Sequence, residues 1–392
     1  MGRTSEAVPN TEMLIWARKS SAMPLEIAAS KLNIDAERLR DWESGEQRPS
    51  IAQLRKIGNL YRRPIAAFYL PKAPDLPKRL RDLRLLPGLK DDIQWIELAW
   101  EERLARERRA IIIELLENQE ETPIEFRHKA DLTQNPEEVG SRVRDILGVT
   151  LEEQSALTTP HEIFKFWRNL IGNSGVLVFQ AIDIPLTTAR GFSIPDFPLP
   201  VIVANRNDAP RARVFTLIHE LTHILLRIGG VCDMDYRDWR PPEEQRIEVF
   251  CNHVAGAVLV PKHNLLSIPL VMRNTTDVSW SEEDIVKLAK LFGVSREVIA
   301  RRLLILDRVT PQFYEMCREQ YQNEYQKAKH HQRQASGFPT PAGNAVSAAG
   351  HQYVSIVLDA LYSDRITRND VATYLGVRLK HLPRIERLVG YA

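Results

Sequence analysis

The sequence contains little of what marks secreted, membrane-spanning or disulfide-rich proteins. Only three of its 392 residues are cysteines, and they show no paired spacing, which favours a reducing compartment over a fold held by disulfides. The first ten residues lack the apolar core of a signal peptide, and no stretch approaches the ~18 consecutive apolar residues of a membrane span. We therefore expect a soluble, cytoplasmic protein with no membrane partner.

A large excess of charge of either sign is also absent. The 53 Lys and Arg residues almost balance the 51 Asp and Glu residues, so that the formal net charge is +2 at pH 7. This balance excludes a histone-like or polybasic nucleic-acid binder, and any contact with DNA must be local. Because single hydrophobic cores stop growing near ~250–300 residues, a chain of 392 residues predicts two or three folded units.

Residues 1–75 have the pattern of a small all-helical domain. Apolar residues recur at helical spacing from Thr11 to Leu70, which predicts four or five short helices. We interpret residues 76–135 as a linker and a connecting helix, the helix covering Asp91–Asn118. Interleaved Glu and Arg residues, including Arg103, Arg106, Arg108 and Arg109, indicate a solvated face on this helix.

Residues 136–310 alternate helical and strand-like patterns, which predicts an α+β, mainly helical fold with a small sheet. Residues 311–350 are interpreted as a helix and a flexible linker, because Lys329–Gly350 is rich in His, Gln, Ser, Gly, Ala and Pro. Residues 351–392 form a C-terminal helical region. The predicted strands are 175–181, 190–194 and 201–205, and the predicted helices are 138–147, 160–170, 209–227, 245–260, 281–292 and 296–306.

His219, Glu220 and His223 form an H-E-x-x-H motif, the pattern of zinc peptidases. Side chains four residues apart share one helix face, so both imidazoles can hold one tetrahedral ion, with Glu220 beside it as the general base. With 10 His in the chain, chance would produce such a motif only ~0.02 times. The flanking residues are apolar, and two unpaired histidines in such a helix would be costly.

A third metal ligand must come from elsewhere, because the residues after His223 do not continue the metzincin pattern. Glu248 is our first candidate, since it lies on an otherwise apolar helix face, where a buried carboxylate needs a cation. His253 is interpreted as a satisfied core histidine, with a ligand role left open. The other competing ligands are loop charges, namely Glu243, Glu244, Asp233 and Asp235.

The strand Arg190–Ile194 precedes the metal helix, where zinc peptidases of this type offer an edge strand to an extended substrate. An ordinary sheet edge is the alternative interpretation.

These motifs together resemble the ImmA/IrrE family of metallopeptidases over roughly residues 140–305. The resemblance lies in three segments: Phe215–Leu226 with the metal motif, Glu248–Ala255, and Leu259–Pro261 at the helix end. The segment Pro200–Asn205 also fits, while Cys251 and His253 depart from the usual residues.

The resemblance implies a zincin-like domain that uses zinc, or alternatively manganese, for endoproteolysis of a helix-turn-helix repressor of stress or mobile-element genes. The rival hypothesis is a non-catalytic regulator or antitoxin that binds DNA and a toxin encoded by a neighbouring gene. Glu220 favours the enzyme, because a purely structural metal site has no use for a base. A homodimer is a further expectation.

The N-terminal segment resembles the XRE (Cro/CI-type) helix-turn-helix domain, on the residues Pro24–Ile34 and Leu39–Ser50. Ala28 and Ala29 allow two helices to approach, and Asn33 can adopt the left-handed turn conformation. Arg38, Arg40 and Arg48 are the candidate DNA contacts. The segment Glu12–Leu70 holds 10 Lys/Arg against 7 Asp/Glu, and this small surplus leaves protein docking or dimerisation open.

Two further segments, Val286–Leu303 and Ile366–Leu382, have a helix-turn-helix rhythm. The first is typical of this peptidase family and is expected to be structural. For the second we favour packing or contact with a partner, although a basic cluster there could meet phosphate. The cluster consists of Arg378, Lys380, His381 and Arg384.

Overall fold

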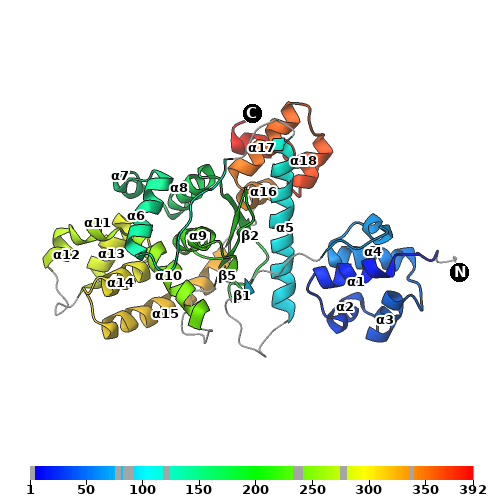
Figure 1. Cartoon of the computed structure of the whole chain (residues 1–392), viewed down its shortest axis with the longest axis horizontal. Coiled ribbons are helices and arrows are strands. Elements are labelled where there is room, and N and C mark those ends of the chain that lie inside the picture. Colours follow the sequence, from blue (N-terminus) through cyan, green and yellow to red (C-terminus); the bar gives the residue numbers. More distant parts are fainter. Residues whose placement is uncertain are drawn as a thin grey trace. The chain divides into compact units, whose positions relative to one another are not determined.

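The computed structural model describes residues 5–75, 81–82, 92–117, 124–232, 242–273, 280–335 and 340–391. The chain is mainly helical with one small sheet, which confirms the predicted fold class (Figure 1). It divides into two compact units: unit 1 comprises Met1–Arg79, Pro87–Leu104 and Asp183–Thr188, and unit 2 comprises Leu80–Leu86, Ala105–Ile182 and Ala189–Ala392. None of the helices in the described ranges combines the length and apolar character needed to cross a membrane.

Unit 1 contains the short helices that the apolar spacing predicts between Thr11 and Leu70. Leu14, Trp42 and Ile57 are buried in its core. Arg18 donates two hydrogen bonds, of 2.7 and 2.8 Å, to the largely buried carboxylate of Glu43, and this ion pair joins the first helix to the third. The elements are α1 (Thr11–Ser20), α2 (Leu25–Leu32), α3 (Ala36–Ser44), α4 (Ile51–Tyr61) and the 3-10 helix η1 (Ile65–Tyr69).

The turn between α2 and α3 has the geometry expected from its residues. Ala28 and Ala29 are buried where α2 packs on α3. Asn33 ends α2 with φ 55° and ψ 50°, which confirms the predicted left-handed conformation. Asparagine tolerates this region better than most residues, so the chain turns there without a glycine.

Helix α5 (Asp92–Glu117) agrees with the predicted long helix, whose end residues Asp91 and Asn118 lie outside the described residues. The expected solvated face is wrong for Arg108, which is only 7% exposed. Its guanidinium lies 5.3 Å from the ring centre of Phe179 and 5.9 Å from that of Tyr353. A guanidinium can stack on aromatic rings, which makes burial tolerable for this cation.

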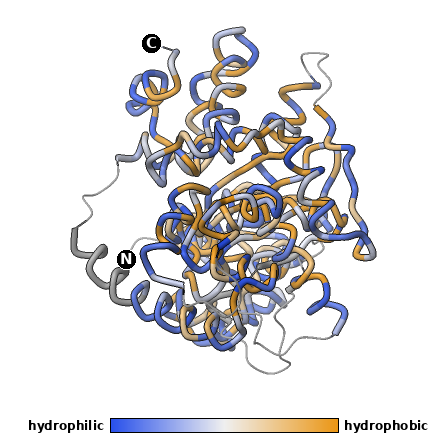
Figure 2. Tube along the Cα trace, turned by 90° about the vertical axis from the view of Figure 1, so that its left-hand side faces the viewer, coloured by the Kyte–Doolittle hydropathy of each residue, from blue (hydrophilic) through white to orange (hydrophobic). Residues whose placement is uncertain are grey.

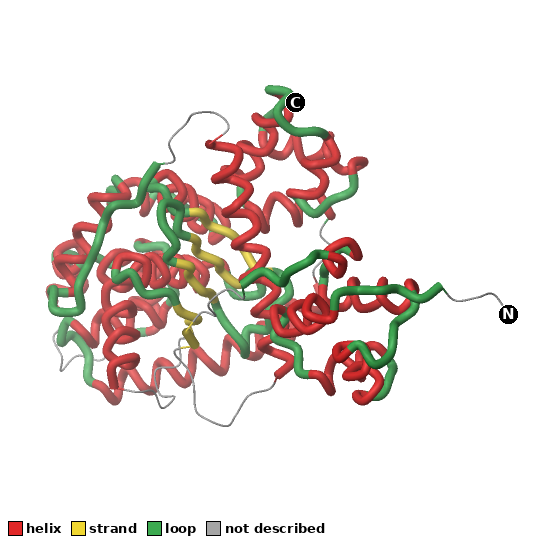
Figure 3. The backbone as a smooth tube through the Cα atoms, turned by 45° about the vertical axis from the view of Figure 1, so that its right-hand side comes forward, coloured by secondary structure: helices red, strands yellow, loops and turns green. Residues whose placement is uncertain are grey.

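Unit 2 is built around a five-stranded sheet, which lies among the helices (Figure 3). The order is β1-β5-β3-β4-β2, with β3 antiparallel to both neighbours and the other two pairings parallel. The three predicted strands are present, and the two short strands β1 and β5 were not predicted. The bounds are β1 (Arg81–Asp82), β2 (Leu177–Ala181), β3 (Gly191–Ile194), β4 (Val201–Asn205) and β5 (Gly230–Cys232).

The prediction that the strand at 190–194 is a sheet edge is wrong. β3 pairs with β4 on one side and, through Gly191–Ser193, with β5 on the other. β5 follows the metal-motif helix and has only three residues, too few for an alternating pattern to reveal it. An extended substrate therefore has no open pairing edge on β3.

Helices surround this sheet and supply most of the hydrophobic core of unit 2. Figure 2 shows hydrophobic stretches of the trace gathered in the interior. Helix α9 (Pro210–Leu225) packs on α8, α10, β3 and β4. The other helices up to residue 335 are α6 (Pro136–Leu147), α7 (Leu151–Ser155), α8 (Pro160–Asn173), α10 (Pro242–Leu259), α11 (Lys262–Leu266), α12 (Pro269–Arg273), α13 (Glu282–Leu291), α14 (Arg296–Ile305) and α15 (Pro311–Ala335).

The prediction of a linker or weakly ordered arm at Lys329–Gly350 is wrong for the described residues of this segment. Helix α15 continues to Ala335, and Pro341–Ala349 forms α16, while residues 336–339 lie outside the described residues. Ala342, Ala348 and Ala349 are buried, and α16 packs against β2. Small side chains that looked linker-like allow this close approach, and alanine is the strongest helix former.

The predicted C-terminal helical region is confirmed. It contains α17 (His351–Tyr362), α18 (Arg368–Tyr374), the 3-10 helix η2 (Leu379–His381) and α19 (Leu382–Val389). In Figure 1 these helices lie together beside α16, next to the chain terminus.

Candidate metal centre

The metal motif lies in the most deeply buried helix of the described part of unit 2. Every residue of α9 from Arg213 to Leu225 is buried, and Pro210 stands in its first turn, where a missing N–H is tolerated. His219 and His223 are one helical turn apart, and both side chains are essentially inaccessible to solvent. Among the described residues, the polar contacts of these two imidazoles are with each other and with side chains of α10.

Helix α10 brings the predicted third ligand to these histidines. The carboxylate of Glu248 lies 3.5 Å from Nε2 of His219 through one oxygen and 3.2 Å from Nε2 of His223 through the other. The two Nε2 atoms are 3.0 Å apart. The three predicted ligands therefore converge on one point.

These distances fit a shared divalent ion. Tetrahedral ligands at ~2.0–2.1 Å from zinc are about 3.3 Å from one another, close to the three separations found here. The ligand atoms of these three side chains all lie within 4.8 Å of one another. Two nitrogens and a carboxylate oxygen are donors that suit zinc and also manganese.

The electrostatics of the cluster favour a cation. Burial alone would raise the pKa of Glu248, but the two imidazoles hold this pKa well below its usual value. Glu248 is thus an ionised carboxylate with almost no access to water, a charge that costs stability unless a positive group compensates it.

Glu220 is also fully buried, and its carboxylate makes no hydrogen bond with the described residues. Burial raises its pKa above the usual value, while the charges of His223 and His219 act in the opposite direction. A carboxylate with a raised pKa beside a metal site is suited to accept and return a proton.

The strand β3 packs directly on the motif helix near Glu220. A Cβ atom at Gly191 would lie 2.5 Å from Cγ2 of Thr216 and 3.7 Å from Cγ of Glu220. Only glycine allows the β3 backbone this close to α9. Gly191 therefore decides how near the sheet comes to the motif.

Asn252 is a site residue to which the sequence analysis assigned no role. Its Oδ1 lies 3.1 Å from Nδ1 of His219, so the imidazole N–H donates to the amide oxygen and Nε2 remains free for a metal. The sequence spacing could have indicated this role, because Asn252 follows Glu248 by one helical turn and lies on the same face of the helix.

This arrangement of two histidines, two glutamates and an asparagine lies within a span that matches a known domain family. Residues 173–304 match the family model of the IrrE N-terminal-like domain (Peptidase_M78). The match supports a metallopeptidase-like function for this span, called the IrrE-like domain below. No curated protein matches the chain.

The competing ligands do not join the cluster. In the IrrE-like domain, His253 lies 2.8 Å from Oε1 of Glu137, whose two oxygens also accept hydrogen bonds of 2.6 and 2.9 Å from Arg302. Glu243 and Glu244 stand in the first turn of α10, outside the group of converging ligand atoms. Asp233 and Asp235 lie outside the described residues.

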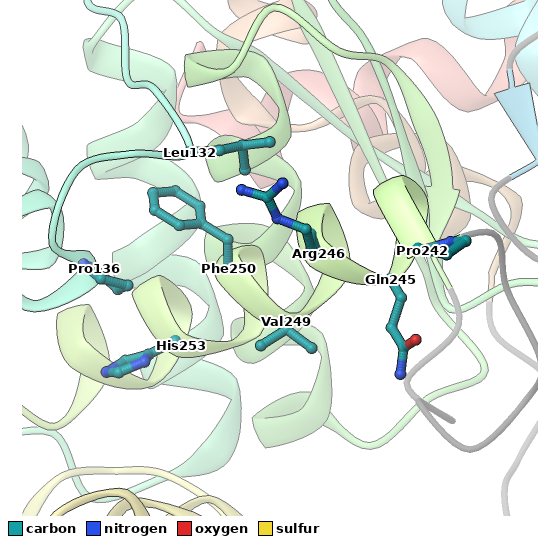
Figure 4. Close-up of a pocket in the computed structure, with 8 residues that line it drawn as sticks. All are labelled: Leu132, Pro136, Pro242, Gln245, Arg246, Val249, Phe250 and His253. Carbon is teal, nitrogen blue, oxygen red and sulfur yellow. The ribbon is translucent and has the colours of Figure 1, made fainter.

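A pocket of about 510 Å³ lies along the exposed side of α10, and none of the motif residues lines it (Figure 4). It is largely apolar, with the Arg246 guanidinium near Leu132. The pocket is therefore not part of the metal centre. Its lining residues are Leu132, Pro136, Pro242, Gln245, Arg246, Val249, Phe250 and His253.

In unit 1, the three arginines predicted to contact DNA are all exposed. Arg38 lies on α3 with its guanidinium 5.5 Å from the ring centre of Trp42. Arg40 is on the same helix, and Arg48 follows its C-terminal Gly45. None of the three is recorded in an ion pair with another described residue.

Proposed function

We propose that the IrrE-like domain is the catalytic domain of a metal-dependent endopeptidase. The observation that carries the proposal is the convergence of His219, His223 and Glu248 at the separations of a shared ion. Glu220 is buried beside them, and its carboxylate has no hydrogen-bond partner among the residues that the structure describes; it supplies the group that a purely structural site would not need.

In this proposal, His219, His223 and Glu248 hold a zinc or manganese ion. The ion, when bound, lowers the pKa of a water molecule and polarises the peptide carbonyl. Glu220 accepts the proton of the attacking water as the new carbon–oxygen bond forms, and returns a proton to the amine nitrogen as the carbon–nitrogen bond breaks. Asn252 keeps the His219 ring oriented throughout.

We further propose that the substrate is a partner transcriptional regulator with a helix-turn-helix domain. The resemblance of this chain to ImmA/IrrE peptidases supports that choice, and so does the helix-turn-helix pair α2 and α3 in unit 1. Unit 1 would bind DNA through Arg38, Arg40 and Arg48 and so bring the peptidase domain to the genes that the regulator controls. We propose that the protein acts in the cytoplasm.

The test compares the chain with its Glu220→Gln variant, each co-expressed with the proteins encoded by neighbouring genes. Mass spectrometry should find a cleaved regulator only with the intact chain. The amide keeps the shape of the carboxylate but removes the base, so cleavage should fall by about 10²–10⁴-fold while the metal stays bound.

Equal cleavage by both proteins would contradict the role of Glu220. If no partner is cleaved and Glu220→Gln leaves gene regulation unchanged while His219→Ala abolishes it, the metal is structural. The non-catalytic regulator would then replace the peptidase.

A further inference from the structure

The C-terminal helices are firmly attached to the sheet of unit 2. Arg168 of α8 donates hydrogen bonds to the carbonyl oxygens of Ser347 (2.8 Å) and Ala348 (3.3 Å), in the last turn of α16. Gln180 of β2 donates a further hydrogen bond of 2.7 Å to Ser347. Helix α16 in turn packs on α19, and α17 packs on both α18 and α19. Residues 340–391 are therefore an ordered part of unit 2.

Helices α18 and α19 follow one another in the chain, joined by a turn and η2, and both pack on α17. Gly376 follows α18 with φ 64°, in the left-handed region that favours glycine, and η2 then leads into α19. Leu382, Ile385 and Val389 are buried on the inner face of α19. Arg384, Arg387 and Leu388 are exposed on its other face.

Four exposed cations lie close together in the sequence, two on the outer face of α19 and two in the segment before it. We call Arg378, Lys380, Arg384 and Arg387 the C-terminal basic surface. All four side chains are exposed, and none forms an ion pair with another residue that the structure describes. From Gly376 to Tyr391, Glu386 is the single acidic residue in the sequence.

Three carboxylates of the C-terminal helices accept local hydrogen bonds. Glu386 accepts a hydrogen bond of 2.7 Å from the hydroxyl of Tyr362, and Asp359 accepts one of 2.6 Å from Tyr391. Asp370 accepts two bonds of 2.8 Å from Thr367 in a capping box. These carboxylates accept hydrogen bonds from hydroxyl and backbone N–H groups, and the four cations are exposed to solvent.

We propose that the C-terminal basic surface binds the phosphates of double-stranded DNA. Clustered, exposed cations on one face are the usual electrostatic footprint of nucleic-acid binding. An exposed helix carrying two of them, preceded by a turn carrying the other two, suits the wide major groove of B-DNA. The deep, narrow major groove of duplex RNA does not admit such a helix. This site is separate from unit 1 and independent of the proposed peptidase activity.

The test measures binding of a fluorescent DNA duplex to the full chain by anisotropy over a range of salt concentrations. The variant replaces Arg378, Lys380 and Arg384 with Gln, and the matched control replaces the exposed Lys129, Lys262 and Lys290 with Gln. Both lose three positive charges. The first should bind about 10-fold more weakly than the control, and its log–log salt slope should be smaller by about 2–3, since each phosphate contact contributes ~0.9.

A second variant tests whether weaker DNA binding results from the lost positive charges or from a damaged fold. Arg378→Lys with Arg384→Lys keeps both cations and should retain most of the affinity, because a phosphate accepts either ammonium or guanidinium. Both variants should keep the thermal midpoint of the unaltered chain.

Equal DNA binding by the Gln variant and the control would overturn the proposal. It would also fail if the variant lost binding only to duplex RNA, to polyglutamate or to phosphatidylserine-containing vesicles. Repeating the measurement with Arg38, Arg40 and Arg48 replaced by Gln distinguishes the two surfaces. If replacing Arg378, Lys380 and Arg384 still weakens DNA binding when the three unit 1 arginines are already Gln, the result supports a second site. If it no longer weakens binding there, the proposal is contradicted.

Discussion

Nδ1 of His219 lies 3.1 Å from Oδ1 of Asn252, one helical turn beyond Glu248 on α10. The same helix therefore provides a carboxylate to the metal cluster and the amide that orients one of its histidines. From this relationship we expect Asn252, an uncharged residue with no ligand atom in the cluster, to influence metal affinity.

Asn252→Ala should weaken metal binding by about 10–100-fold without abolishing it, because loss of the acceptor frees the His219 ring and its tautomer. Asn252→Asp keeps an acceptor at the same position and should lose less. Competition with a chromogenic chelator measures both affinities. Equal affinities for Asn252→Ala and the unaltered chain would show that His219 is oriented by packing alone.

The purified chain should hold about one divalent ion, since it supplies three ligands for a four-coordinate site. His219→Ala, His223→Ala and Glu248→Ala should each lose most of this metal in elemental analysis. His253→Ala is the control on the same helix, because His253 contacts Glu137 and lies outside the cluster. Full metal content in Glu248→Ala, or loss of metal in His253→Ala, would contradict the assigned third ligand.

The Glu137–Arg302 ion pair should make unit 2 sensitive to acid. Despite partial burial, hydrogen bonds from His253 and Arg302 lower the pKa of Glu137 from 4.5 to about 2. The carboxylate therefore stabilises the fold above about pH 4.5, and this contribution is lost as the pH falls towards 2. Arg302 is fully buried, so removing its partner leaves an uncompensated charge.

Glu137→Gln should accordingly lower the free energy of unfolding by roughly 2–4 kcal/mol at pH 7. The difference from the unaltered chain should shrink between pH 4.5 and pH 2. Urea unfolding followed by circular dichroism measures it, with the exposed Glu138→Gln as the matched control. A difference that does not depend on pH would exclude the ion pair as its source.

DNA binding by unit 1 should depend on Arg38, Arg40 and Arg48. Replacing all three with Gln should weaken binding to the upstream DNA of the chain's own gene and reduce the salt slope by about 0.9 per lost phosphate contact. The control replaces Lys19, Arg55 and Lys56, which are also exposed in unit 1. A gel-shift assay at low salt in which both variants bind alike would favour a docking role for unit 1.

The sequence alone determined the features that depend on local spacing. The four-residue separation of His219 and His223 places them on one helix face, and apolar periodicity located the three longer strands and most of the helices. Asn33 could be assigned a left-handed turn because few residues tolerate that backbone conformation.

Tertiary packing decided what spacing could not. In the sequence, Glu248 was one of several candidate ligands; the packing of α10 on α9 places it beside the two histidines. The same packing brings Asn252 to His219. The strand β3 looked like an edge because its partner β5 is short and distant in sequence. The segment that forms α16 looked like a linker because the burial of its alanines depends on packing against β2. Pairing and burial are relations between segments far apart in the chain, so a local pattern carries little information about them.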